Sequence, residues 1–72
     1  MFVKLLDRKS KRFFAGANID SDKVGEKEIR EILFENNIHV DEFGNLRNVV
    51  GEFMNIHLHN VEPVFVCTKA VV

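Results

Sequence analysis

The chain has 72 residues, with ten Lys and Arg against eleven Asp and Glu, so its formal net charge is −1. Hydrophobic residues make up 46% and include seven Phe. This composition excludes a disordered chain, which would be poor in aromatics and high in net charge. It also excludes a global field that attracts nucleic acid or an anionic membrane. We expect a single domain over residues 1–72.

Cysteine usage and hydropathy bear on the compartment. Cys67 is the only cysteine, so no internal disulfide can form, and a small domain without disulfides is typical of a reducing compartment. The short apolar start is interrupted by Lys4 and closed by Asp7, unlike a signal peptide. No run approaches the roughly 20 apolar residues of a membrane span. We therefore expect a cytoplasmic protein with no membrane association.

The N-terminal segment has the alternation of a strand. Residues 2–6 alternate so that Phe2, Lys4 and Leu6 lie on one face of the strand. After a polar break, residues 12–15 are β-prone and can return antiparallel as the second arm of a hairpin.

A helix is predicted over residues 25–36. Gly25 is an acceptable N-cap, and Glu28 stands where the carboxylate of a capping box belongs. Asn36 and Asn37 can end the helix, because Asn tolerates the left-handed conformation after a C-cap. The apolar stripe of this helix consists of Ile29, Ile32 and Leu33.

The second half of the chain contains further strands and one ambiguous segment. Residues 38–41 and 55–59 alternate like strands, and residues 64–68 are strongly β-prone. Residues 46–54 match the helical template and favour a short helix, although Gly51 lies in the middle. The positions that fit the template are Leu46, Val49, Val50, Phe53 and Met54.

These elements predict an α+β fold. We expect a small antiparallel or mixed sheet of four to five strands, one helix over residues 25–36 and a possible second, short helix over residues 46–54.

A basic segment precedes two phenylalanines. Its basic side chains at a hairpin tip could contact phosphates. A neighbouring Phe ring could stack on an unpaired nucleobase. The alternative is a solvated turn whose basic side chains discourage edge-to-edge pairing with another sheet. Because adjacent residues of a strand point to opposite faces, we expect at least one of Phe13 and Phe14 to lie outside the core. The residues of this candidate nucleic-acid site are Arg8, Lys9, Lys11, Arg12 and Phe13.

Two histidines and the cysteine form a weak metal-ligand pattern. His57 and His59 would share one face of a strand, and Cys67 on a neighbouring strand could add a third zinc ligand. The alternative places both imidazoles in solvent and Cys67 in the core as a small hydrophobe. Closely spaced Cys pairs, phosphate-binding Gly loops and nucleophile motifs are lacking. We therefore expect no metal or other cofactor and no enzymatic activity.

The C-terminal run is apolar on both faces of its strand. Such a strand must be covered on both faces or contact a partner. Because helices on so small a sheet can cover only one side, the other side needs a partner. We therefore expect a small interaction or regulatory module without catalytic activity that forms a two-fold homodimer or binds another protein. The expected interface residues are Val64, Phe65 and Val66. The alternatives are a central strand in a monomeric core, and a nucleic-acid-binding domain that uses residues 8–14.

Overall fold

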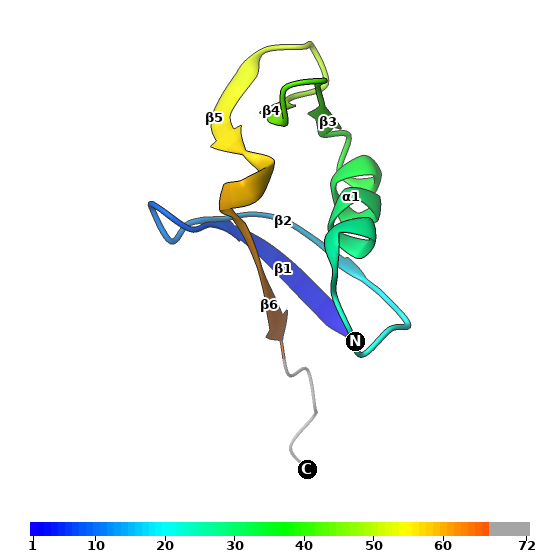
Figure 1. The fold of residues 1–72 in the computed structure, drawn as a ribbon. Coiled ribbons are helices and arrows are strands. Elements are labelled where there is room, and N and C mark those ends of the chain that lie inside the picture. The colour runs from blue at the N-terminus through cyan, green and yellow to red at the C-terminus, as the bar shows by residue number, and fades with distance from the viewer. Residues whose placement is uncertain (67–72) are drawn as a thin grey trace.

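The computed structural model describes residues 1–66 and shows an α+β fold (Figure 1). The elements in chain order are β1 (Phe2–Asp7), β2 (Phe13–Asn18), α1 (Glu26–Glu35), β3 (His39–Val40), β4 (Asn45–Arg47), β5 (Phe53–His57), the 3₁₀ turn η1 (Leu58–Asn60) and β6 (Val61–Val66). The strands form two antiparallel sheets of three, in the orders β2-β1-β6 and β3-β4-β5. The α+β class is confirmed, whereas the expectation of one sheet of four to five strands is wrong.

Sheet A, the β2-β1-β6 sheet, has the N-terminal strand at its centre. The hairpin predicted from the N-terminal pattern is confirmed, with Val3 opposite Ala17 in β2. On its other side β1 pairs with β6, where Val3 lies opposite Phe65. The chain closes this sheet with its last described strand, so β6 is an edge strand.

The helix is confirmed with the capping residues expected from the sequence. Glu28 accepts a hydrogen bond from the N–H of the N-cap Gly25 (2.8 Å). At the other end Asn37 adopts φ 60°, and the N–H of Ile38 donates to the carbonyl of Leu33 (2.9 Å). This is the 6→1 bond of a Schellman motif. This motif turns the chain sharply into β3, the first strand of the β3-β4-β5 sheet, called sheet B below. The end of α1 therefore determines where sheet B begins.

Sheet B is a meander built from two turns of the same chemistry, and the helix favoured over residues 46–54 is wrong. Asp41 and Asn48 each begin a turn that Gly44 or Gly51 completes three residues later, with i→i+3 bonds of 3.0 and 2.9 Å. Each starting side chain also accepts two backbone N–H groups from its own turn. The glycines have φ +85° and +88°, which favour Gly over other residues.

The core joins sheet A, the helix and sheet B. Val3 and Leu5, on one face of β1, are fully buried together with Ile32 and Leu33 of α1. Leu46 of β4 completes this cluster from sheet B. The remaining buried members of the cluster are Ile38, Leu58 and Val61.

The chain passes from sheet B to sheet A through η1, and here the predicted boundaries shift. The strand expected over residues 55–59 lies at 53–57 and is followed by η1. The strand expected over 64–68 begins earlier, at Val61, and includes Pro63. Residues 67 and 68 lie outside the described residues.

Candidate interaction surfaces

Sheet A has a second apolar face, opposite the core. Directly opposed residues of antiparallel strands have side chains on the same face. The register places Phe2 opposite Val66 and Lys4 opposite Val64. Leu6 lies opposite Phe13. The same register places Glu62 opposite Leu6, Gly16 opposite Lys4 and Asn18 opposite Phe2. The face so defined, called the open face below, consists of Phe2, Lys4, Leu6, Phe13, Gly16, Asn18, Glu62, Val64 and Val66. None of these residues belongs to the core cluster or to the hydrophobic residues that pack against it.

One cation lies in the middle of the open face. Lys4 occupies the central strand and the central row, and its Nζ lies 5.1 Å from the centroid of the Phe13 ring. Phe2 covers Gly16 of the neighbouring strand, since a Cβ at Gly16 would lie 3.0 Å from Phe2 Cζ. Leu6 is only 7% exposed although it lies outside the core cluster. The face is therefore largely apolar, with the Lys4 ammonium at its centre and the Glu62 carboxylate, paired with Arg8 and Lys11, at the end nearest the hairpin tip.

The structure divides the three expected interface residues between two faces. Val64 and Val66 belong to the open face, opposite Lys4 and Phe2. Phe65 lies opposite Val3 on the core side and is 46% exposed there. The three residues therefore do not form one surface, and the open face contains two of them.

Both edges of sheet A are partly blocked. Arg8 N–H donates to the Asn60 carbonyl (2.7 Å), and hydrogen-bonded pairs alternate along an antiparallel ladder. The pair of Leu5 with Pro63 is then non-hydrogen-bonded, so the nitrogen of Pro63 faces the free edge of β6 and supplies no donor there. At the β2 edge, Asn36 Nδ2 donates to the Gly16 carbonyl (3.0 Å). The faces of sheet A are thus better placed for contact than its edges.

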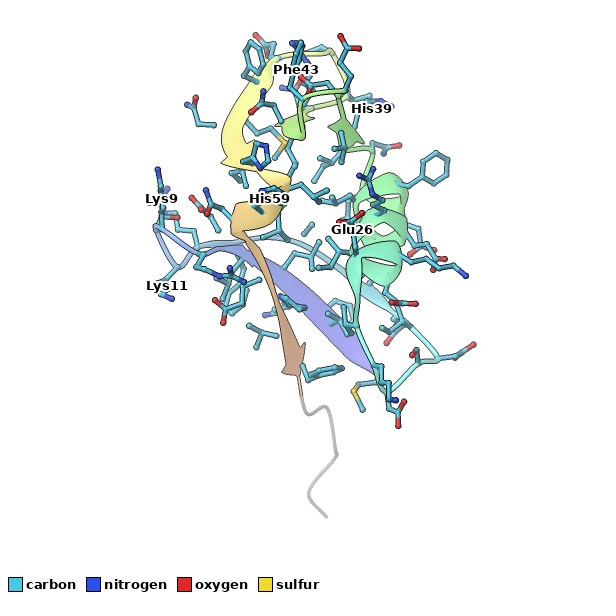
Figure 2. All side chains as sticks on the ribbon, viewed as in Figure 1. Lys9, Lys11, Glu26, His39, Phe43 and His59 are labelled. Atoms are coloured by element: carbon cyan, nitrogen blue, oxygen red, sulfur yellow. The ribbon has the colours of Figure 1, made fainter. Side chains whose placement is uncertain are left out.

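The basic segment forms the exposed tip of the β1–β2 hairpin, from which Lys9 and Lys11 project (Figure 2). Glu62 forms ion pairs with Arg8 (3.4 Å) and Lys11 (3.9 Å). Within residues 1–66, neither Lys9 nor Arg12 lies within 4.0 Å of a carboxylate. The tip therefore keeps a net positive charge.

A groove runs between the start of β2 and β5. Its volume is about 510 Å³. Phe13, the last residue of the candidate nucleic-acid site, is 52% exposed and lines it, while Phe14 packs against the core. The full lining, called the β2–β5 groove below, is Asp7, Ser10, Arg12, Phe13, Phe14, Met54, Asn55 and Ile56. Arg12 and Phe13, two residues of the candidate nucleic-acid site, lie on one wall of this groove, and the β5 residues of the other wall were not among the residues predicted from the sequence.

The His57 ring links two backbone groups of the fold. His57 Nδ1 accepts a hydrogen bond from the N–H of His59 (3.1 Å), and its Nε2 lies 2.8 Å from the Phe43 carbonyl. With Nδ1 accepting, Nε2 carries the proton and donates it, so neither ring nitrogen is free for a metal. Within residues 1–66 no group of three or more His, Cys, Asp or Glu side chains could hold a metal ion. Cys67, the third residue of the weak metal pattern, lies outside the described residues.

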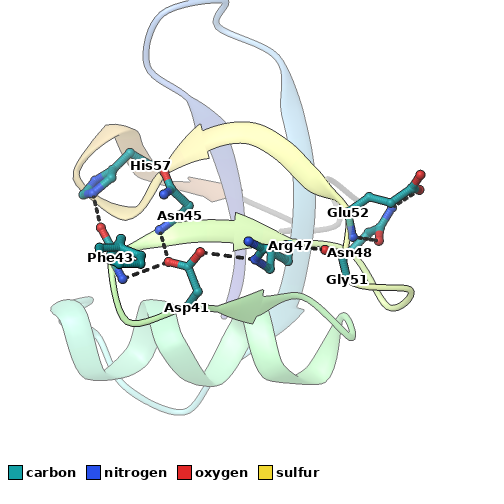
Figure 3. A network of polar contacts seen from close by, with 8 residues as sticks. All are labelled: Asp41, Phe43, Asn45, Arg47, Asn48, Gly51, Glu52 and His57. Atoms are coloured by element: carbon teal, nitrogen blue, oxygen red, sulfur yellow. Dashed lines mark hydrogen bonds and ion pairs between the residues drawn. The ribbon is translucent and has the colours of Figure 1, made fainter.

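A second polar network holds the turns of sheet B (Figure 3). Asp41 accepts hydrogen bonds from Asn45 N–H (2.9 Å), Phe43 N–H (2.9 Å) and Arg47 Nε (3.2 Å). Burial acts to raise the pKa of Asp41, but the hydrogen bonds from these groups and the charge of Arg47 outweigh it and hold the pKa below its ordinary value. Arg47 also donates to the Gly51 carbonyl (2.6 Å), so one side chain links both turns.

Comparison of the chain with protein-family models, curated protein sequences and solved structures finds no match. The helix among residues 1–66 is too short and too polar to cross a membrane.

Proposed function

We propose that this protein is a cytoplasmic interaction module without catalytic activity that self-associates through the open face of sheet A. The observation that carries the proposal is the apolar face opposite the core. A sheet that is apolar on both faces is normally covered on both, and the helix and sheet B contribute their buried side chains to the other face. A second copy of the same face supplies a matching apolar cover. The single cysteine supports a reducing compartment.

The size of the face sets the strength of the contact. Three strands about 4.8 Å apart and five residues of about 3.4 Å each span a plane of about 250 Å². Stable interfaces bury about 800 Å² on each partner. Even with the relief of the side chains, the open face falls short of that area. The expected dimer is therefore weak and reversible, as suits a module whose assembly responds to its concentration.

The position of Lys4 gives this dimer a distinctive salt dependence. A two-fold interface is isologous, so an axis through the centre of the face brings Lys4 opposite Lys4 of the second copy. Like charges at that position repel one another, and salt screens the repulsion. Self-association should therefore strengthen as salt rises.

The test is sedimentation velocity over a concentration series with two matched variants. Val64→Lys adds a second cation to the centre of the open face, whereas Val50→Lys places the same side chain on the exposed turn of sheet B. We expect Val64→Lys to abolish the dimer and Val50→Lys to leave it intact, with circular dichroism confirming that both variants fold. A wild-type monomer up to about 1 mM, or a dimer that survives Val64→Lys, would exclude this interface.

A further inference from the structure

Phe13 is an exposed ring in a position where the fold does not need it. The core takes Phe14, its neighbour in the sequence. Phe13 remains 52% exposed at the mouth of the β2–β5 groove, with the Lys4 ammonium 5.1 Å from its centroid. An aromatic ring held in water beside cations is the usual platform on which an unpaired base stacks.

The opposite wall of the groove carries a second unusual residue. In β5, the three residues 54–56 lie opposite the single residue Leu46 of β4, which makes a bulge larger than the usual two residues against one. Within this bulge Asn55 adopts φ +59°, a left-handed conformation that is uncommon for a residue other than Gly. Bulges of this kind often direct a side chain toward a site.

Among residues 1–66 the exposed Asn55 side-chain amide makes no hydrogen bond, whereas those of Asn36 and Asn48 do. Of the Asn residues without such a bond, Asn55 is the one that lines the β2–β5 groove. An amide offers one acceptor and two donor hydrogens, which suits the edge of a nucleobase.

The charges around the groove favour an anion. Arg12 lines it and Lys9 lies on the adjoining tip, both without a carboxylate partner among residues 1–66. The one carboxylate of the lining, Asp7, is already engaged by Lys9 N–H (3.2 Å) and the Ser10 hydroxyl (3.1 Å). The acidic helix lies elsewhere, as the separation of Glu26 from Lys9 and Lys11 in Figure 2 shows. The chain is nearly neutral as a whole, but four of its ten Lys and Arg residues lie within residues 8–12.

From these observations we propose that the β2–β5 groove binds single-stranded nucleic acid. Phe13 stacks on one base, Asn55 hydrogen-bonds to the edge of that base, and Arg12 with Lys9 contacts the flanking phosphates. The strand must be single because a paired base is stacked on its neighbours and presents no free face to the Phe13 ring. This proposal does not require self-association, and the two have opposite salt dependence.

The experiment is a fluorescence-anisotropy titration with labelled oligonucleotides of about 12 nucleotides, a length that suits small single-strand-binding domains. Mixed-sequence DNA, mixed-sequence RNA and a DNA duplex serve as the three probes. We expect both single strands to bind more tightly than the duplex. With about two phosphates contacted, one each by Arg12 and Lys9, raising salt from about 50 to about 200 mM should weaken binding about 7-fold.

Two pairs of variants test the roles of the ring and the charge. Phe13→Ala should weaken single-strand binding about 5- to 150-fold, whereas Phe34→Ala, which removes a 77% exposed ring from the acidic helix, should have no effect. Arg12→Gln should lower the slope of log affinity against log salt by about 0.7, and Lys27→Gln on the helix should not.

A third variant tests the amide alone. Asn55→Gly keeps the left-handed backbone, since Gly adopts φ > 0 without strain. It should narrow the differences in affinity among homopolymers of different bases while leaving the salt slope unchanged.

Four results would overturn the proposal. One is the absence of binding at low salt, and another is equal affinity for duplex and single strand, which would show contact with phosphates alone. A third is an equal effect of Phe13→Ala and Phe34→Ala. The fourth is a Phe13→Ala variant that loses the dimer but binds oligonucleotide normally, which would assign Phe13 to the protein interface only.

Discussion

Replacing the central cation of the open face should strengthen self-association. In a face-to-face dimer two packed sheets lie about 10 Å apart. The Lys4 side chains extend into the space between the sheets and can bend apart, so we take about 10 Å as the upper limit of the ammonium separation. At that separation the two groups repel by about 0.4 kcal/mol in water and by about 1.7 kcal/mol at an effective dielectric constant of about 20. Lys4→Met removes this repulsion and keeps the length of the side chain. We therefore expect the dimer dissociation constant to fall about 2- to 20-fold.

The assay is sedimentation velocity at two salt concentrations. Lys27→Met is the matched control, because it makes the same substitution at an exposed position of α1. Wild type should dimerise more tightly at about 0.5 M salt than at about 0.05 M, since the Debye length shrinks below the separation of the charges. Lys4→Met should lose this dependence. If Lys4→Met dimerises no more tightly than Lys27→Met, the two copies do not pack with Lys4 at their centre.

Two further predictions concern sheet B. Gly44→Ala places a Cβ 2.6 Å from His57 Nε2 at φ +85°, so it should lower the free energy of unfolding by about 2–3 kcal/mol, the sum of backbone strain and a lost hydrogen bond. Gly51→Ala, at φ +88° with nothing within 4 Å of its Cβ, should cost only the backbone strain. If thermal melts show the same loss of stability for Gly44→Ala and Gly51→Ala, the His57 hydrogen bond does not contribute. Asp41→Asn should destabilise the protein at neutral pH, because a lowered pKa stabilises the fold above the ordinary value of 3.8 and that stability is lost as pH falls through the folded-state pKa. The melting temperatures of wild type and Asp41→Asn should therefore converge in acid, and a difference that persists there would show that the charge is not what matters.

The helix was predictable because its signals are local. Gly25, Glu28 and Asn37 each act through a backbone group within a few residues, so their sequence pattern and their geometry coincide. The N-terminal hairpin was predictable for the same reason: its alternation has one interpretation. The position of the last strand at one edge of sheet A could not be predicted from the residues near it in the sequence. It depends on η1, which returns the chain from sheet B to the side of β1.

In the segment 46–54 the helical spacing of the apolar residues led to a wrong prediction. Its apolar residues fit a helix, but only Leu46 is buried and only Met54 packs against the core, while Val49, Val50 and Phe53 are exposed. The deciding signal was turn chemistry, since Asn at the first position and Gly at the fourth favour a type I turn. The same spacing occurs at Asp41 and Gly44, seven residues earlier, and both turns form. A polar residue followed three positions later by Gly outweighed the apolar period.

The candidate surfaces were only half visible in the sequence. The basic tip and Phe13 are consecutive, so composition alone singled them out. Asn55 lines the same groove as Phe13, from a bulge that forms only because β5 pairs with β4. The residues around Asn55 in the sequence do not predict that pairing. The division of Val64 and Phe65 between two faces follows from alternation, but knowing which face is covered required the position of the helix.

The two surfaces share Phe13, and this makes them thermodynamically linked. Phe13 belongs to the open face through its pairing with Leu6 and also lines the β2–β5 groove. If the dimer covers this ring, a base cannot stack on it, so each ligand must weaken the other by the same factor. Adding a single-stranded oligonucleotide to a concentrated sample should therefore dissociate the dimer into complexes with one protein chain, as sedimentation would show. Raising salt in the same sample should reverse the change, because salt weakens phosphate contacts and screens the repulsion between the two Lys4 ammonium groups. Complexes that retain two protein chains would show that Phe13 is outside the dimer contact and would move the interface toward Phe2 and Val66.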